Sequence, residues 1–140
     1  VKRVKDKGSL AVRVNDPLEI CKNVFLSGEM GDLIKEQSLI LDTKKGLVII
    51  TGCAHPGIVE IVKKSVARFN KKAYFVFGGF HLLDKAEAEV REIISALKAL
   101  GVTKCGATHC TGDKAILLFK DAYGENYVSL GVGKVIMLPY

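Results

Sequence analysis

The chain has 140 residues, of which 49% are apolar, so it is long enough to bury a substantial core, and we expect residues 1–140 to form a single domain. No apolar run approaches the roughly 18 residues that a membrane-spanning helix needs, and no secretory leader is recognisable, which predicts a cytoplasmic protein without membrane association. The formal charge of +6 favours an anionic partner in general, phosphate included, but the basic residues are dispersed, so a solvated basic surface is the simpler interpretation. Few aromatic residues accompany the charge, so a nucleic-acid partner is disfavoured.

The four cysteines, Cys21, Cys53, Cys105 and Cys110, show no C-x-x-C spacing. In a cytoplasmic chain we expect them to be free thiols, because structural disulfides belong mainly to oxidising compartments. Cys53 directly follows an apolar run, where a metal ligand would be well placed. For the other three, the simpler interpretation is a small buried side chain or an inert thiol.

The first third of the chain has the character of β-strands. Apolar runs bounded by Gly, Pro, Asn or Asp predict strands over residues 10–14, 21–27, 38–42 and 47–51. Pro17 helps to end the first of these, because proline cannot donate a ladder hydrogen bond. A tight link over residues 44–46 predicts that the last two strands form a hairpin.

Downstream, predicted helices alternate with strands. Helical spacing of apolar residues predicts helices over residues 56–69, with Pro56 in its first turn, and 84–100, with Gly101 as a left-handed cap. Asp84 and Glu87 have the spacing of a capping box. The remaining predicted elements are strands over 73–77 and 104–107, a helix over 112–119, and strands near 127–130 and 134–138. This order predicts an α/β or α+β fold, with a mixed sheet covered by helices on at least one face.

The three histidines of the chain, His55, His81 and His109, share one position in this scheme. Each follows a predicted strand and precedes a predicted helix. Because the carboxyl ends of parallel strands meet at one edge of a sheet, we expect the three side chains to gather there beside helix N-termini. A single histidine could simply mark where the chain reaches the surface, whereas three together predict a functional site.

Imidazole and thiolate are ligands that a borderline-soft divalent cation prefers. His55, His109 and Cys53 therefore predict a metal site, with zinc as the first choice and manganese or iron as alternatives. Three protein ligands would leave one position open, and water bound at such a position becomes a nucleophile near neutral pH. The ligands are far apart in the sequence, so their spacing alone is a weak signal.

Three motifs resemble the metallo-β-lactamase superfamily of metal-dependent hydrolases: T-G-C-A-H-P-G at 51–57, F-G-G-F-H-L at 77–82 and T-H-C-T-G at 108–112. More narrowly, they are similar to the subfamily named for 7,8-dihydropterin-6-methyl-4-(β-D-ribofuranosyl)-aminobenzene-5′-phosphate synthase, which serves methanopterin biosynthesis. The resemblance covers essentially the whole chain and implies the C-terminal half of an αββα sandwich with a dinuclear metal site. The H-x-H-x-D-H signature of the superfamily's N-terminal half is missing here.

By this resemblance, His109 matches the last metal-binding histidine, and His55 matches the histidine that follows the central strand. Cys53 stands where many relatives place a bridging aspartate. His81 is implied to ligate a metal, to donate a proton as a catalytic residue or to hold a phosphate, and we expect the contact with substrate. Lys114, near the start of the next predicted helix, could steady a phosphate, but a solvated surface position is the simpler interpretation.

The resemblance implies a metal-dependent hydrolase, or a synthase that transfers a pterin group, acting on a phosphorylated or otherwise anionic small molecule. The basic balance of the chain favours such a substrate. The alternative is a truncated, non-catalytic module that binds a nucleotide or a protein partner, and the missing signature favours it. Half of a sandwich is also expected to associate with its missing N-terminal half, or to form a homodimer, because one apolar sheet face would otherwise be exposed.

Overall fold

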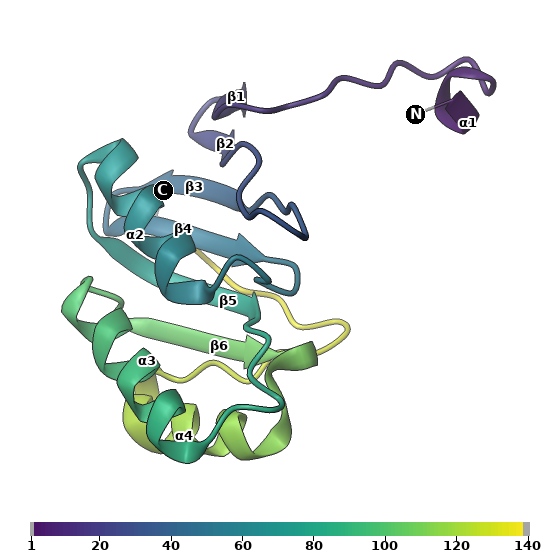
Figure 1. The fold of residues 1–140 in the computed structure, drawn as a ribbon. Helices are drawn as coiled ribbons and strands as arrows, with labels where there is room; N and C mark the ends of the chain where they lie inside the picture. Colours follow the sequence, from purple (N-terminus) through teal and green to yellow (C-terminus); the bar gives the residue numbers. More distant parts are fainter. Residues whose placement is uncertain (1, 139–140) are drawn as a thin grey trace.

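A computed structural model describes residues 2–138, which form a six-stranded sheet with helices packed beside it (Figure 1). The strands lie in chain order across the sheet: β1 (Leu18–Cys21), β2 (Val24–Leu26), β3 (Leu39–Thr43), β4 (Gly46–Thr51), β5 (Ala73–Gly79) and β6 (Lys104–Thr108). The helices are α1 (Lys2–Lys5), α2 (Ile58–Phe69), α3 (Glu87–Ala99) and α4 (Asp113–Tyr123), with short 3-10 turns η1 (His109–Thr111) and η2 (Gly124–Asn126). None of these helices is long and apolar enough to cross a membrane.

The sheet is antiparallel from β1 to β4 and parallel from β4 to β6, which confirms the predicted mixed sheet. The predicted hairpin of β3 and β4 is also confirmed, because Thr43 pairs with Gly46 across a two-residue turn. α2 carries the chain from β4 back to β5, and α3 carries it from β5 back to β6. Such crossovers make neighbouring strands parallel, so the carboxyl ends of β4, β5 and β6 meet at one edge of the sheet.

The helices α2, α3 and α4 lie on one face of the sheet and make the main core with it (Figure 1). Phe80 and Phe119 are buried at its centre, with ring centroids 5.3 Å apart and an edge-on arrangement. The apolar stripe of α3 is buried as its spacing predicts, through Val90, Ile94 and Leu97. This face is therefore closed by residues of the chain itself.

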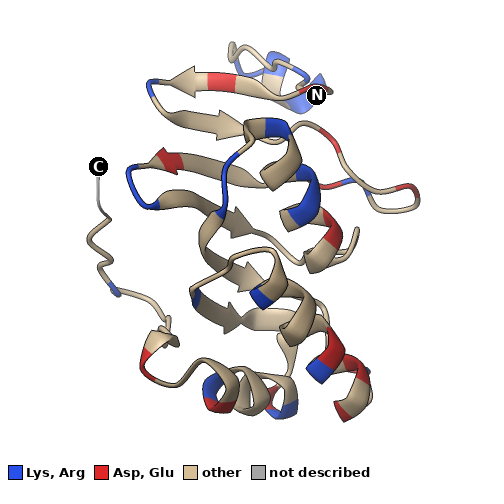
Figure 2. Cartoon of the chain, turned by 90° about the vertical axis from the view of Figure 1, so that its left-hand side faces the viewer, with Lys and Arg blue, Asp and Glu red and all other residues tan. Residues whose placement is uncertain are grey.

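The opposite face has a smaller apolar cluster, centred on Leu41, Val48 and Phe75. Figure 2 shows the helices on one side of the sheet and the C-terminal segment, residues 128–138, on the other. Ile136 and Leu138 pack against this second cluster, whereas Val135 and Met137 are 77% and 89% exposed. One extended segment therefore covers part of this face while exposing apolar side chains of its own.

Charged side chains are mixed over the surface, as the sequence indicates. In Figure 2, Lys and Arg lie on α1, on the turn between β3 and β4, and on the longer helices, with acidic residues interspersed. On the helices, the pairs Lys64–Glu60, Lys85–Glu89 and Arg91–Glu87 have the i,i+4 spacing of helical ion pairs. The excess of positive charge is thus spread over several elements.

Two predicted strands near the N-terminus are wrong. Residues 10–14 are irregular, and Leu10 is 86% exposed, so this apolar run has no sheet to join. Residues 21–27 do not form one strand, because the left-handed Asn23, at φ 64°, turns the chain between β1 and β2. The amide of Asn23 donates to the Glu19 carboxylate at 3.0 Å and stabilises this turn.

The strands predicted over residues 127–130 and 134–138 are also wrong within the described part of the chain. Tyr127 makes only an isolated parallel bridge to Cys105, and the Val128 amide donates to the Cys105 carbonyl at 2.7 Å. Beyond this point the segment leaves the edge of β6 and crosses the second face. Strand-forming residues need a neighbouring strand to complete a ladder, and this segment meets none there.

Helix α2 begins two residues later than predicted and ends where predicted. Gly57, at φ 95°, lies immediately before the helix, so Pro56 belongs to the preceding turn. Asn70 closes α2 in the left-handed conformation at φ 48°.

Helix α3 ends at Ala99, one residue before the predicted end, with Leu100 as its cap. Gly101 follows in the left-handed conformation, at φ 87°, as predicted. Its start differs: the helix begins at Glu87, and the amide of Ala86 donates to the Glu89 carboxylate at 3.0 Å. The predicted capping box of Asp84 and Glu87 is therefore wrong by two residues, whereas α4 extends four residues past its predicted end at 119.

Candidate metal centre at the carboxyl ends of the parallel strands

The three histidines lie at the same edge of the sheet, where β4, β5 and β6 end. His55 follows β4, His81 follows β5, and His109 begins η1 directly after β6. The rings of His55 and His81 lie close together, with centroids 4.4 Å apart. The predicted convergence of the histidines is therefore a property of the fold, whereas their chemical roles stay predictions.

Each of the three turns contains a residue in the left-handed region of backbone space that is not glycine. Ala54 has a φ of 60°, and His81 and His109 each have a φ of 51°. A side chain in this conformation costs of the order of 1 kcal/mol, and such residues cluster at functional sites. This repeated backbone geometry turns the chain sharply after each strand, at or next to the histidine.

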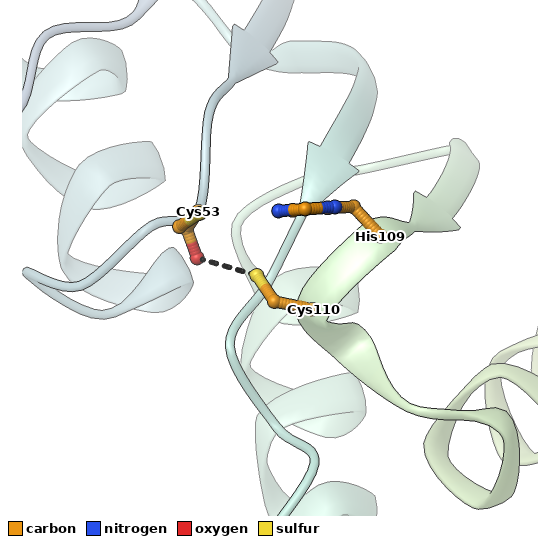
Figure 3. Close-up of side chains that lie close together, drawn as sticks. All are labelled: Cys53, His109 and Cys110. Carbon is orange, nitrogen blue, oxygen red and sulfur yellow. Dashed lines mark hydrogen bonds between the residues drawn. The ribbon is translucent and has the colours of Figure 1, made fainter.

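Two cysteines and one histidine form a first group of possible ligands. One side-chain donor atom from each of Cys53, His109 and Cys110 lies within 4.8 Å of the other two (Figure 3). The thiols are half-buried and the imidazole is exposed. The Cys110 thiol donates to the Cys53 carbonyl at 3.5 Å, which joins the loop after β4 to η1.

The protonation of Cys53 depends on the same neighbour. The hydrogen bond with the Cys110 side chain, followed by burial, raises the pKa of the Cys53 thiol. The neighbouring Cys110 thiol carries no positive charge that could stabilise a thiolate at Cys53. A divalent cation would have the opposite effect, since a coordinated thiol loses its proton.

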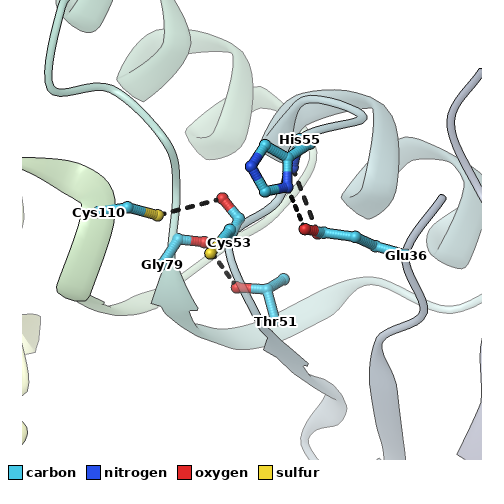
Figure 4. A network of polar contacts seen from close by, with 6 residues as sticks. All are labelled: Glu36, Thr51, Cys53, His55, Gly79 and Cys110. Carbon is cyan, nitrogen blue, oxygen red and sulfur yellow. Dashed lines mark hydrogen bonds and ion pairs between the residues drawn. The ribbon is translucent and has the colours of Figure 1, made fainter. Parts of the chain in front are cut away.

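A second group shares Cys53 with the first and adds Glu36 and His55. Their donor atoms also lie within 4.8 Å of one another. One carboxylate oxygen of Glu36 contacts Nδ1 of His55, and the other accepts a hydrogen bond of 3.2 Å from the His55 backbone amide (Figure 4). Glu36 comes from the loop between β2 and β3, far from the motifs that contain the histidines.

The glycines of the second motif allow these loops to approach one another. A Cβ atom added to Gly79 would lie 2.5 Å from the carbonyl oxygen of Gly52 and 2.8 Å from Sγ of Cys110. The Gly79 amide donates to that Gly52 carbonyl at 2.9 Å, and the Thr51 hydroxyl donates to the Gly79 carbonyl at 2.9 Å. Glycine is thus required for close backbone approach beside the two thiols.

A threonine of the third motif fixes η1 against the end of β5. The Thr111 hydroxyl accepts a hydrogen bond of 3.0 Å from the Phe80 amide and donates one of 2.6 Å to the Thr108 carbonyl. Thr111 is fully buried. These contacts hold the turn that carries His109 and Cys110, so this part of T-H-C-T-G is structural.

His81 lines the surface hollows next to the site. One hollow of about 380 Å³ is lined by His55, His81, Lys85 and Glu60 together with apolar residues that include some of α2 and α3. A second of similar volume lies on the other side, between the two histidines and the loop that follows β2. Lys114 is exposed on the first turn of α4 and lines neither hollow, so its proposed contact with phosphate gains no support.

The chemistry of the two groups fits the metal that the sequence implies. Thiols, imidazoles and a carboxylate are the donors found around zinc, and three of them converge in each group. Sequence reasoning included Cys53, His55 and His109 but missed two further donors, Cys110 and Glu36. Cys110 is adjacent to His109, a signal that was present, whereas Glu36 lies in an unrelated loop with no motif around it.

The other cysteines are remote from this edge of the sheet or inaccessible. All four are free thiols, as predicted. Cys105 is fully buried in the main core, which agrees with its predicted structural role. Cys21 is exposed, because β1 is an exposed edge strand, so of its two predicted interpretations only the inert thiol remains.

Comparisons with known proteins agree with the motifs, although no family model matches the chain. It is 35% identical over 160 aligned positions to 7,8-dihydropterin-6-methyl-4-(β-D-ribofuranosyl)-aminobenzene-5′-phosphate synthase of Methanocaldococcus jannaschii, an alignment that covers 95% of this chain and 54% of the relative. An uncharacterized protein of the same archaeon is 30% identical over 141 positions, with 88% of this chain and 53% of the relative covered. The chain thus spans about half the length of these curated relatives.

A solved structure gives the same result for the fold. A metal-dependent hydrolase of the β-lactamase superfamily superposes with a TM-score of 0.82 and 32% sequence identity, covering 94% of this chain and 59% of the other. The sequence identity and the shared fold extend over nearly all of the 140 residues. This chain therefore belongs to the metallo-β-lactamase superfamily, and it matches about half of the length of each of these relatives.

Proposed function

We propose that this chain forms part of a zinc-dependent enzyme that acts on a small phosphorylated or otherwise anionic substrate in the cytoplasm. The main support is the convergence of two overlapping groups of possible ligands, Cys53–His109–Cys110 and Glu36–Cys53–His55, at the edge of the sheet where three parallel strands end. This edge is where α/β sheets place their active sites. The metal-dependent hydrolase with the same fold adds support for a metal in general.

Within this proposal, the side chains divide into those that hold zinc and those that face the substrate. Cys53, His109 and Cys110 are the first candidates to hold it, and His55 approaches the same thiol from the other side. When bound, zinc would supply a Lewis acid that stabilises negative charge as it develops on a substrate oxygen. His81 is the exposed histidine between the two hollows, and there it can contact substrate or donate a proton.

The substrate class rests on chemistry and on the relative. The product named for the 35% identical archaeal synthase carries a 5′-phosphate. The hollow beside His55 and His81 has an apolar wall, which suits a ring. Its charged lining is mixed, because it includes the carboxylate of Glu60 and the ammonium group of Lys85, which pairs with Glu89 at 2.9 Å. The support for an anionic group therefore comes mainly from the relative. Both a hydrolase and a pterin-transferring synthase are compatible with this arrangement, since each stabilises phosphate or diphosphate charge.

A complete enzyme would need more than this chain. The H-x-H-x-D-H signature is absent from these residues, and the relatives are nearly twice as long as the matched region. We therefore expect the site to be completed by a polypeptide equivalent to the rest of the relatives, or by a second copy of this chain. If zinc binding is absent from the chain alone, a non-catalytic module becomes the better description.

Zinc content tests the proposal directly. The full chain, purified without chelator, is expected to contain zinc close to stoichiometry by inductively coupled plasma mass spectrometry, and Cys110→Ala and His109→Ala should lose most of it. Cys21→Ala is the matched control, because this thiol lies on the exposed edge strand β1 and should leave the zinc content unchanged. Equal zinc in all four proteins would show that the metal binds elsewhere, and no zinc in any of them would refute binding by this chain.

A further inference from the structure

Glu36 contacts His55 through both oxygens of its carboxylate. One oxygen meets Nδ1 of the imidazole, and the other accepts from the backbone amide of the same residue at 3.2 Å. The two side chains are mostly shielded, with 18% of Glu36 and 25% of His55 exposed. A carboxylate that holds both the ring and the backbone of one histidine restricts its position and its rotation.

The loop that carries Glu36 is itself firmly held. The amides and carbonyls of Met30 and Glu36 exchange two hydrogen bonds of 2.9 Å, which close the loop at its base. Gly31 has a φ of 96°, and a Cβ atom there would lie 2.5 Å from the Ile34 carbonyl and 3.0 Å from Cγ of Pro56. The loop therefore packs on itself and against the residue after His55, so Glu36 meets the histidine from a fixed support.

An ionised carboxylate can only accept hydrogen bonds, and a neutral imidazole carries one proton on one of its two nitrogens. The contact with Glu36 thus requires the proton on Nδ1 and leaves the lone pair on Nε2. Carboxylates that accept from a ligating histidine orient the ring and raise its basicity. The opposite tautomer would set the lone pair of Nδ1 against the negative charge of Glu36.

We infer that Glu36 is a positioning residue for His55, which holds the imidazole as the Nδ1–H tautomer and presents the Nε2 lone pair to a zinc ion or a substrate proton. The inference deepens the proposed function, since the use of Nε2 rests on it. The effect of Glu36 on the tautomer, however, is a property of the chain without metal. It explains why a residue from the antiparallel part of the sheet reaches the site.

The tautomer of His55 is measurable by nitrogen-15 NMR on the full, metal-free chain at about pH 8.5, well above the ordinary pKa of free imidazole. The ring signals are assigned from His81→Gln and His109→Gln. In the wild type, His55 should show a protonated Nδ1 and an unprotonated Nε2. In Glu36→Ala most of the population should change to the other tautomer, whereas Glu36→Gln, whose amide oxygen still accepts, should keep the wild-type form. An unchanged tautomer in a folded Glu36→Ala protein would overturn the inference.

Glu29→Ala is the matched control, because Glu29 precedes the same loop but pairs with Lys35 at 3.2 Å and does not contact His55. Zinc affinity supplies the second readout. Glu36→Ala should weaken binding by about 10- to 100-fold, the usual effect of losing such a supporting carboxylate. Glu36→Gln should retain most of the affinity. Equal losses in Glu36→Ala and Glu36→Gln would instead make Glu36 a direct ligand and contradict the positioning role.

The two readouts separate this inference from the proposed function. Suppose that His55 has the expected tautomer in the wild type, that Glu36→Ala changes it, and that neither protein binds zinc. This result would support the positioning role of Glu36 and reject the zinc site. If Cys110→Ala loses zinc but the tautomer of His55 is the same in the wild type and in Glu36→Ala, the zinc site is supported and the positioning role is rejected. If Glu36→Ala fails to fold, Glu36→Gln still tests the inference. A changed His55 tautomer in folded Glu36→Gln would show that an uncharged oxygen acceptor is not sufficient, and it would contradict the mechanism.

Discussion

The two faces of the sheet differ in how completely this chain covers them. On the face beneath α2, α3 and α4, 21 of the described residues are buried in one cluster, whereas on the other face only Leu41, Val48 and Phe75 are. The first face is closed by regular helices with buried stripes. The second is crossed by an extended segment that pairs with no strand beyond its bridge at Tyr127. The helical face is thus covered by regular elements of the chain, while the second face is only partly covered.

This difference agrees with the match to about half of each longer relative. A mixed sheet with helices on one side buries the other side only if another layer is present. Apolar side chains at the surface of residues 127–138, such as Met137 at 89% exposure, are the ones that such a layer would cover. We expect the two faces to respond differently to the same kind of mutation.

The largest expected loss of stability comes from a mutation in the core beneath the helices. Phe119→Ala removes a fully buried ring that contacts Phe80 and should lower the free energy of unfolding by about 3 to 5 kcal/mol. Ile136→Ala, in the segment on the second face, should lower it by about 1 kcal/mol, because this side chain is only partly buried and its segment can readjust. Urea denaturation followed by circular dichroism measures both. Similar losses for the two variants would mean that the faces are equally important for stability.

Alkaline pH should act through the helical face. Burial raises the pKa of the Cys105 thiol from 9.0 to about 12, and burial raises that of the Tyr127 hydroxyl from 10.0 to about 12. Above pH 9 the unfolded chain releases these protons while the folded chain keeps them, so stability is complete below pH 9 and falls as the pH rises towards 12. The thiol alone should account for about 3 kcal/mol near pH 11.

Urea denaturation at several pH values between neutrality and about pH 11 checks this decline, with Cys105→Ala as the comparison. The variant starts from a lower stability because it leaves a small cavity, but its loss with rising pH should be shallower. Parallel curves for the two proteins would show that the Cys105 thiol does not carry the effect. Labelling with a thiol reagent gives an independent check, since exposed Cys21 should react in the folded protein and Cys105 only after unfolding.

The smallest expected effect concerns the edge of the sheet where β4, β5 and β6 end and the candidate site lies. Gly79→Ala forces a methyl group against the Gly52 carbonyl and the Cys110 thiol and should cost about 1 to 2 kcal/mol. It should also reduce zinc binding, because the loops after β4 and β6 must separate. Gly52→Ala is the matched control, since its added Cβ meets no atom within 4 Å. Thermal unfolding and zinc content should therefore change in the first variant only, and equal changes would reject the close-approach argument.

The sequence predicts the parallel part of the sheet and the gathering of the histidines because both follow from local patterns. A strand, a helix and a parallel strand repeat from β4 to β6, and each histidine follows a strand, so the topology alone brings His55, His81 and His109 to one edge. The strands predicted at 10–14 and 134–138 fail for the opposite reason. Their residues favour strands, but strand formation depends on a neighbour that the local pattern does not reveal.

The candidate site is predicted only where its residues belong to motifs. Cys53 and His109 come from strand ends that the sequence marks clearly. Glu36 is contributed by the antiparallel half of the sheet, and it reaches His55 only because the Met30–Glu36 bridge holds its loop beside that turn. Such a contact depends on tertiary structure and leaves no periodic signal. The same is true of the contact that places Cys110 beside Cys53.

The three left-handed residues at the strand ends have a consequence for attempts to improve the protein in the laboratory. Glycine would relieve the backbone strain of the order of 1 kcal/mol at each position. At Ala54 the exchange would also remove a methyl group that is buried in the main core, so part of the gain would be offset. At His81 and His109 the same exchange would remove an imidazole. Selection for thermal robustness alone would thus erode this edge of the sheet, and a screen for stable variants should retain zinc binding as a second criterion.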